Sequence, residues 1–139
     1  EYFNLYPGVK QHMDATIEMA KDKGYVETMT GRRRYLRDIN SSNWTVRGTA
    51  ERTAVNTPIQ GSAADMIKLA MIRVARVIKK EQLRTKMLLQ VHDELVFDLY
   101  LDEQLLVEPL VVQCMQEALP LKVPVVVDTG IGKNWLEAH

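Results

Sequence analysis

The sequence predicts an α+β fold in which an antiparallel sheet packs against a long helix. Two apolar runs, residues 87–91 and 95–99, flank three ionisable residues, as the strands of a tight β-hairpin would. A long helical pattern over residues 62 to 81 precedes them. The expected order is helix, small hairpin, two helices, β-hairpin, helix and strand, which is typical of the α+β class.

Composition and charge are those of an ordinary globular chain. The 139 residues are 46 % hydrophobic and 26 % charged, and the formal net charge is zero. This fits one compact domain or a piece of a larger protein, with no overall electrostatic attraction to nucleic acid or membrane. Cys114 is the only cysteine, which excludes an internal disulfide and a cysteine-based zinc site. No stretch is long and apolar enough to form a transmembrane helix.

The first quarter of the chain predicts a helix followed by a small hairpin. Pro7 is tolerated in the first turn of the helix, and Gly24 is a good C-terminal stop. Residues 25–29 alternate as a short strand, and residues 34–36 form the returning strand after a turn. The arginines at 32–34 cluster at this return, where they suit either phosphate contact or a solvated loop.

The middle of the chain predicts two helices separated at a proline. The first covers residues 44–55, and Pro58 is expected to stop it. Arg52 and Asn56 share a face near its end because they are four residues apart, and Gln60 follows in the turn. A guanidinium and two amides at this point suit either a capped helix end or contact with a ligand.

The second of these helices is expected to begin at residues 62–65, which resemble a capping box with Asp in the last position. Its polar positions fall within roughly 140° of arc, which predicts a mostly buried core helix. A further helical stretch is expected over residues 102–119. Within it, Pro109 either lies in the first turn of a helix or follows a separate turn over residues 102–108. Residues 125–128 read as another strand.

The expected tip of the β-hairpin carries His92, Asp93 and Glu94. Charged groups held in partly buried positions need a partner. A carboxylate at a strand tip suits Mg²⁺, although such a site normally needs a second carboxylate from elsewhere. The spacing leaves a metal site and a salt-bridged turn as alternatives. A zinc site would need further ligands, and only His12 and His139 remain.

Four sequence blocks carry a resemblance to a known family. They are QVHDELVF (90–97), GYVETMTGRRRYLRDI (24–39), AERTAVNTPIQGSAADMIKLAM (50–71) and VPVVVDTGIGKNW (123–135). The first resembles motif C of the family A DNA polymerases. The others resemble the C-terminal part of the same family, in order and at fitting distances. The resemblance covers essentially the whole chain.

The resemblance implies a segment of a DNA-directed DNA polymerase that acts in DNA replication and repair in the cytoplasm. Residues 1–46 would be the helical C-terminal part of the fingers subdomain. Residues 47–139 would be the second part of the palm, with an antiparallel palm-type sheet and a catalytic β-hairpin packed against long helices. The implied partners are primer-template DNA and deoxynucleoside triphosphates, with no membrane.

The resemblance also implies roles for the three residues of the hairpin tip. In this family two metal ions support attack of the primer 3′-hydroxyl on the α-phosphate of the incoming nucleotide. Asp93 matches one of the two metal-binding aspartates and would ligate Mg²⁺. Glu94 matches an acidic neighbour that supports the site, and His92 matches a residue near the primer terminus.

Three residues on the predicted helix before Pro58 and in the turn after it match DNA contacts of the family. Arg52, Asn56 and Gln60 match the polar group that contacts primer-template near the growing end, largely in the minor groove. The acceptors there are similar for all correct pairs, so such contacts sense geometry more than sequence. DNA contact by Arg32, Arg33 and Arg34 is left open.

Motif A, which carries the family's other metal-binding aspartate, is absent from these residues. The fingers helix with the catalytic Lys and the Arg for the triphosphate is absent too, and both would precede residue 1. The chain starts without an initiator Met and resembles a C-terminal segment. We therefore expect the isolated chain to lack polymerase activity. Exposed sheet edge and apolar surface would allow it to self-associate.

Two other functions stay open at this point. A non-enzymatic DNA-binding module is disfavoured by the zero net charge, since nonspecific DNA binders usually carry a basic excess. A metal-dependent nuclease would need more carboxylates around Asp93 than the spacing suggests.

Overall fold

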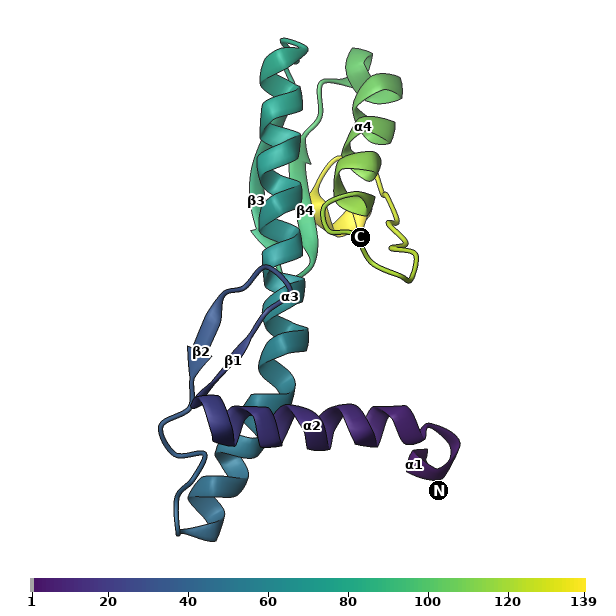
Figure 1. Cartoon of the computed structure of the whole chain (residues 1–139). Coiled ribbons are helices and arrows are strands. Elements are labelled where there is room, and N and C mark those ends of the chain that lie inside the picture. Colours follow the sequence, from purple (N-terminus) through teal and green to yellow (C-terminus); the bar gives the residue numbers. More distant parts are fainter. Residues whose placement is uncertain (1) are drawn as a thin grey trace. The chain divides into compact units, whose positions relative to one another are not determined.

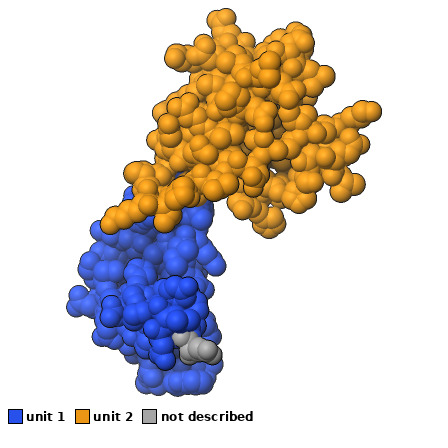
Figure 2. Space-filling view, turned by 90° about the vertical axis from the view of Figure 1, so that its right-hand side faces the viewer, with its two compact units in different colours: residues 1–65 blue, residues 66–139 orange. Residues whose placement is uncertain are grey.

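The computed structural model describes residues 2–139, which divide into two compact units. Of the described residues, unit 1 covers 2–65 and unit 2 covers 66–139 (Figure 2). Helices dominate, and the strands of the described residues form two antiparallel two-stranded sheets, as expected for the α+β class. None of the described helices combines the length and apolarity that a membrane span requires. The expected fingers–palm boundary after residue 46 is not tested by this division and stays a prediction.

Unit 1 contains two helices, a hairpin and the first part of a third helix (Figure 1). The elements are α1 (Tyr2–Leu5), α2 (Pro7–Lys23), β1 (Tyr25–Glu27), β2 (Arg33–Tyr35) and the start of α3 (Trp44–Lys80). As predicted, proline occupies the first position of α2, and a glycine in the left-handed conformation ends it. The hairpin β1–β2 also forms as predicted, although β1 is two residues shorter than expected and β2 begins and ends one residue earlier.

The core of unit 1 gathers side chains from α2, the hairpin, the loop that follows it and α3. The buried cluster consists of Ala20, Val26, Leu36, Ile39, Ala50 and Ala54. Two of its members, Ala50 and Ala54, are alanines on α3. This cluster fixes the hairpin against the first part of α3.

Helix α3 does not end at Pro58, which corrects the sequence prediction. Pro58 lies inside the helix and lacks the N–H that would bond to the carbonyl of Ala54. An interior proline costs a helix about 3 kcal/mol. The helix continues because Pro58 removes one main-chain bond only, and because the turn of the distant β1–β2 hairpin binds the residues that follow.

Residues 62–65 are therefore an interior turn of α3 and do not cap a new helix. The Ser62 hydroxyl donates to the carbonyl of Pro58 and accepts a 2.9 Å hydrogen bond from the Met29 N–H. Asp65 binds the hairpin turn as well. Ser62 and Asp65, which predicted the start of a helix, instead bind the turn of the β1–β2 hairpin.

Unit 2 places a hairpin and a helix beside the second part of α3 (Figure 1). Its further elements are β3 (Lys86–Val91), β4 (Glu94–Asp98), η1 (Leu101–Glu103), α4 (Gln104–Gln116) and α5 (Trp135–Ala138). The second part of α3 is less buried than predicted. Ala70 and Val74 are buried, whereas Ile72 is 47 % exposed, because the described part of unit 2 covers only one side of the helix.

Two further predictions for this half of the chain are wrong. Pro109 lies in the middle of α4, so it neither opens a helix nor follows a separate turn. Residues 125–128 do not form a strand. A strand needs a neighbour to pair its main-chain groups. The two sheets of the described residues have no third strand, and Val126 is 79 % exposed.

Candidate functional site

The β3–β4 hairpin places Asp93 at its tip. Val91 pairs with Glu94, which leaves His92 and Asp93 as a two-residue loop. His92 has φ = +53°, a left-handed conformation of the kind that tight hairpin loops use. The Gln90 side-chain amide donates to the carbonyl of His92. Contacts within the hairpin itself therefore fix the backbone of the loop.

The three side chains of this tip have different surroundings. His92 and Asp93 are exposed, and Glu94 is half-buried. Glu94 accepts a 3.4 Å hydrogen bond from Trp135 Nε1, and its other oxygen lies 2.9 Å from His139 Nδ1. Within residues 2–139, the Asp93 carboxylate makes no hydrogen bond or ion pair. The tip thus presents one carboxylate to solvent and holds the other against α5 and the residue after it.

The contact of Glu94 with Trp135 and His139 was missed by the sequence reasoning. Trp135 follows Glu94 by 41 residues, and no spacing rule connects them. The only signal was that Trp135 belongs to one of the four resembling blocks. Tight packing around α5 depends on Gly130 and Gly132, since a Cβ at either position would run into Ala138 or Glu137.

Asp93 offers oxygen donors of the kind that Mg²⁺ prefers. Among the residues that the structure describes, no three His, Cys, Asp or Glu side chains gather in a geometry that could hold a metal ion. Asp93 can therefore supply one ligand of a metal site whose other ligands come from elsewhere. A complete site would need at least one further carboxylate beside Asp93.

Arg52, Asn56 and Gln60 form a row on α3 within unit 1. They are exposed and four residues apart, so they follow one face of the helix. Gln60 lies in the helix, not in the turn predicted for it. Arg52 Nη2 donates a 3.1 Å hydrogen bond to Thr49 Oγ1, which orients the guanidinium. The hairpin tip, by contrast, belongs to unit 2.

Two of the three consecutive arginines are engaged within unit 1. Arg32 Nε donates to Asp65 at 2.9 Å. Arg33 Nε donates to Glu27 at 2.7 Å, and its guanidinium lies over the Tyr25 ring. These contacts give both side chains a structural role. Arg34 is exposed.

Asp65 is a buried carboxylate of unit 1 with two side-chain hydrogen bonds from the hairpin. It is only 7 % exposed and accepts a 2.6 Å hydrogen bond from Thr30 Oγ1 in addition to the bond from Arg32. The hydroxyls of Thr28 and Thr30 and the Arg32 guanidinium lower the pKa of Asp65 below its ordinary value, against the opposing effect of burial. Asp65 therefore stays ionised and fastens the hairpin turn to α3.

Glu103 has a comparable role in unit 2. It accepts hydrogen bonds from the N–H of Arg84 at 2.8 Å and from the N–H and hydroxyl of Thr85 at 2.9 and 2.8 Å. These donors, with the Arg84 N–H contributing most, lower the pKa of Glu103. The Thr85 hydroxyl also accepts from the Tyr100 N–H. The ends of the β3–β4 hairpin are thus tied to η1.

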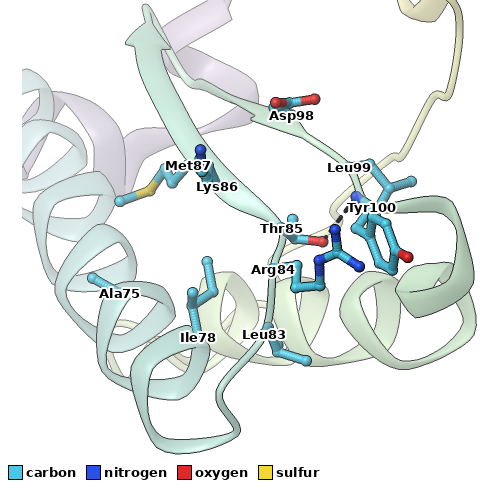
Figure 3. A pocket seen from close by; sticks show the side chains of 10 residues that line it. All are labelled: Ala75, Ile78, Leu83, Arg84, Thr85, Lys86, Met87, Asp98, Leu99 and Tyr100. Atoms are coloured by element: carbon cyan, nitrogen blue, oxygen red, sulfur yellow. Dashed lines mark hydrogen bonds between the residues drawn. The ribbon is translucent and has the colours of Figure 1, made fainter.

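An open groove of about 730 Å³ lies beside this network (Figure 3). Figure 3 shows the Arg84 guanidinium against the Tyr100 ring, at 3.9 Å from the ring centroid. The groove is lined by Ala75, Ile78, Leu83, Arg84, Thr85, Lys86, Met87, Asp98, Leu99 and Tyr100. None of the tip residues lines it, so the groove and the Asp93 carboxylate are separate features of unit 2.

Comparison with known proteins places these features in a family. The family model described as "DNA polymerase family A" matches residues 1–137. Curated relatives named DNA polymerase I include those of Lactococcus lactis subsp. cremoris, 52 % identical over 137 residues, and Bacillus subtilis, 49 % identical over 137 residues. Each alignment covers 99 % of this chain and 16 % of the relative, so the chain spans about a sixth of those proteins.

A solved structure matches as well. It is the POL domain of Pol1 from M. smegmatis in complex with DNA primer-template and dNTP. The TM-score is 0.96 at 49 % sequence identity, and the match covers 99 % of this chain and 24 % of that one. The likeness extends over both the hairpin tip and the row on α3. The chain therefore belongs to DNA polymerase family A and corresponds to a fragment of the relatives that it matches.

Proposed function

We propose that this chain is part of a DNA-directed DNA polymerase that extends a primer by two-metal phosphoryl transfer. The observation that carries the proposal is the exposed Asp93 carboxylate at the tip of a hairpin in a family A chain. The primer 3′-hydroxyl attacks the α-phosphate of a deoxynucleoside triphosphate, and pyrophosphate leaves. The M. smegmatis relative, solved with primer-template and dNTP, supports these substrates.

Asp93 is proposed as a Mg²⁺ ligand. Bound metal ions would stabilise the charge that develops on the transferred phosphoryl group and activate the attacking hydroxyl. The left-handed His92 and the Val91–Glu94 pair fix the backbone from which the Asp93 carboxylate projects. A fixed carboxylate holds charge in place without reorganisation at the moment of reaction.

Glu94 and His92 are proposed as supporting residues. The contacts of Glu94 with Trp135 and His139 hold its carboxylate beside the tip, where it adds negative charge next to Asp93 without being the main ligand. His92 is exposed in the same two-residue loop, a position suited to contact with the primer end.

The exposed row Arg52, Asn56 and Gln60, hereafter the primer-template row, is proposed to contact DNA near the growing end. Its members carry one guanidinium and two amides along a helix face, which can donate to minor-groove acceptors. The row gives a polymerase a means to sense the geometry of a newly formed pair. A cytoplasmic location fits this function and stays a prediction.

The isolated chain is proposed to be inactive, because it supplies one carboxylate of a pair that the metal ions need together. A non-enzymatic DNA-binding module and a metal-dependent nuclease remain weaker proposals. Family membership favours the polymerase over both. The described residues also lack the carboxylate cluster that a self-contained nuclease site would need.

The experiment that tests the proposal replaces Asp93 in the intact polymerase that contains this segment. Asp93→Ala should reduce single-turnover nucleotide incorporation by about 10³-fold or more, since several kcal/mol of transition-state stabilisation is lost. The dissociation constant for primer-template should change by less than about threefold. Asp98→Ala is the matched control, because Asp98 is an exposed aspartate at the far end of β4, the strand that follows the tip.

Two results would count against the role of Asp93. One is an equal loss of DNA binding and incorporation in Asp93→Ala, which would indicate a structural role. The other is an equal loss of incorporation in Asp98→Ala, which would show that the strand and not the tip carboxylate matters.

A further inference from the structure

A break in the main-chain hydrogen bonding of α3, which itself continues as one helix, divides the primer-template row. Pro58 cannot bond to the carbonyl of Ala54, so one main-chain hydrogen bond is missing at this point. Arg52 and Asn56 precede the break, and Gln60 follows it. Helices bend most readily at such prolines. A change in the direction of the helix here would move Gln60 relative to the other two side chains.

The β1–β2 hairpin touches α3 on the near side of this break through packing. Val26 of β1 lies in one buried cluster with Ala50 and Ala54, and it is itself only 1 % exposed. The cluster is apolar, and both of these members on α3 are alanines. It anchors the hairpin strands to the part of α3 that carries Arg52 and Asn56.

The turn of the same hairpin touches α3 on the far side of the break through hydrogen bonds. Asp65 accepts from Thr30 Oγ1 at 2.6 Å and from Arg32 Nε at 2.9 Å, and Arg32 Nη2 donates to the carbonyl of Gly61 at 3.2 Å. Thr28 fills the space where a side chain of Gly61 would be. The hairpin thus has contacts with α3 both before and after Pro58. Figure 1 shows the hairpin beside this helix.

The hairpin leaves the primer-template row uncovered. At 100° per residue, the positions that face the hairpin centre roughly 150° around the helix axis from the centre of the row. Those positions are Ala50, Ala54, Gly61 and Asp65. The hairpin therefore supports α3 from behind, and the row stays open to DNA.

We propose that the β1–β2 hairpin is a splint that fixes the direction of α3 after Pro58 relative to the part before it, and that Asp65 is the positioning residue that fastens it. Asp65 is buried and negatively charged, so it does not contact DNA itself. Its loss releases the hairpin turn from the part of α3 after Pro58, while the apolar cluster before Pro58 remains. The proposal rests on the DNA-contacting role of the row.

The test uses the intact polymerase and measures the primer-template dissociation constant by fluorescence anisotropy. Asp65→Asn, which keeps the size of the side chain, should weaken binding about tenfold. Pro58→Ala restores the missing N–H, so in that background Asp65→Asn should weaken binding less than about twofold. In a Gln60→Ala background Asp65→Asn should likewise add less than about twofold, because the side chain that it aligns is gone.

Glu27→Gln is the matched control. It breaks the ion pair of Glu27 with Arg33 in the same hairpin but touches no contact with α3, and it should leave DNA affinity unchanged. Should Asp65→Asn fail to fold, Thr30→Val, which removes one hydrogen bond to the same carboxylate, is carried through the same backgrounds.

Additive losses would overturn the splint, since a merely structural Asp65 weakens binding equally in the native, Pro58→Ala and Gln60→Ala backgrounds. Native affinity in Asp65→Asn would overturn it as well. A Gln60→Ala variant that binds DNA as tightly as the native protein would contradict the proposed role of Gln60 in the row, and the splint with it. If the losses of DNA affinity are additive and Gln60→Ala itself binds DNA more weakly, only the splint is contradicted. The proposed role of Gln60 in the row then stands.

Discussion

Individual carboxylates in this chain differ in what surrounds them, and that difference separates their roles. Asp65 and Glu103 accept several hydrogen bonds each, and both have a lowered pKa. They hold elements together. Asp93, by contrast, is exposed at a hairpin tip and makes no ion pair within the described residues. A carboxylate left without protein partners is suited to a ligand from outside the chain.

Glu103 gives a pH dependence whose sign follows from its lowered pKa. A group with a folded pKa below its unfolded value stabilises the fold above the unfolded pKa, which is about 4.3 for Glu. That contribution is lost as pH falls through the folded pKa. Thermal unfolding should therefore show Glu103→Gln with a lower midpoint than the native chain at pH 7, and a difference that shrinks below about pH 4.

The comparison for this variant is Glu108→Gln, whose carboxylate accepts one exposed hydrogen bond from Thr129. It should change the midpoint little at either pH. A Glu103→Gln midpoint equal to the native one at pH 7 would show that the contacts of Glu103 with Arg84 and Thr85 do not hold the hairpin to η1.

At the level of single residues, the sequence predicted the hairpin tip well. Two apolar runs separated by polar residues determine a tight turn locally, so His92, Asp93 and Glu94 lie where expected. The partners of Glu94 could not be predicted. Trp135 and His139 reach it only because the chain after α4 folds back, and such tertiary contacts leave no periodic signal.

Among the elements, α3 shows how distant contacts override local signals. Pro58 and the Ser62 capping pattern both indicate a helix boundary in the sequence. The hairpin turn, some thirty residues earlier, supplies the hydrogen bonds that make one continuous helix favourable. Helix α4 likewise continues through Pro109. Local propensity sets a preference, and packing decides the outcome.

Two glycines of α3 provide a matched pair that tests this packing. A methyl group at Gly61 would lie 2.6 Å from Thr28 Cγ2, a buried β-branched side chain that cannot easily move. Gly61→Ala should therefore lower the free energy of unfolding by about 1–3 kcal/mol through overpacking. Gly48 has no atom within 4 Å of the same position. Gly48→Ala should raise stability by up to about 1 kcal/mol through helix propensity.

Urea denaturation of both variants measures these free energies. A Gly61→Ala variant as stable as Gly48→Ala would mean that the hairpin turn does not pack against α3 as described.

For the whole chain, the α+β class and the family were predictable because four separate blocks agree. The missing strand and the exposed apolar surface could not be predicted, because the chain spans only part of the length of its relatives. Residues 125–128 look like a strand in the sequence but have no strand to pair with among the described residues. Large apolar side chains also stay exposed, among them Trp44, Leu105, Val126 and Leu136. Self-association of the isolated chain is consistent with this surface and stays a prediction.

We propose that this chain holds one half of a polymerase site, with Asp93 as its carboxylate. Primer extension by the purified 139-residue chain, with Mg²⁺, primer-template and all four deoxynucleoside triphosphates, is the decisive measurement. The intact polymerase serves as the positive control. We expect no nucleotide incorporation by the isolated chain, because one carboxylate does not hold the two metal ions. Template-directed extension that is lost in Asp93→Ala would contradict the claim, since the chain would then hold a complete site.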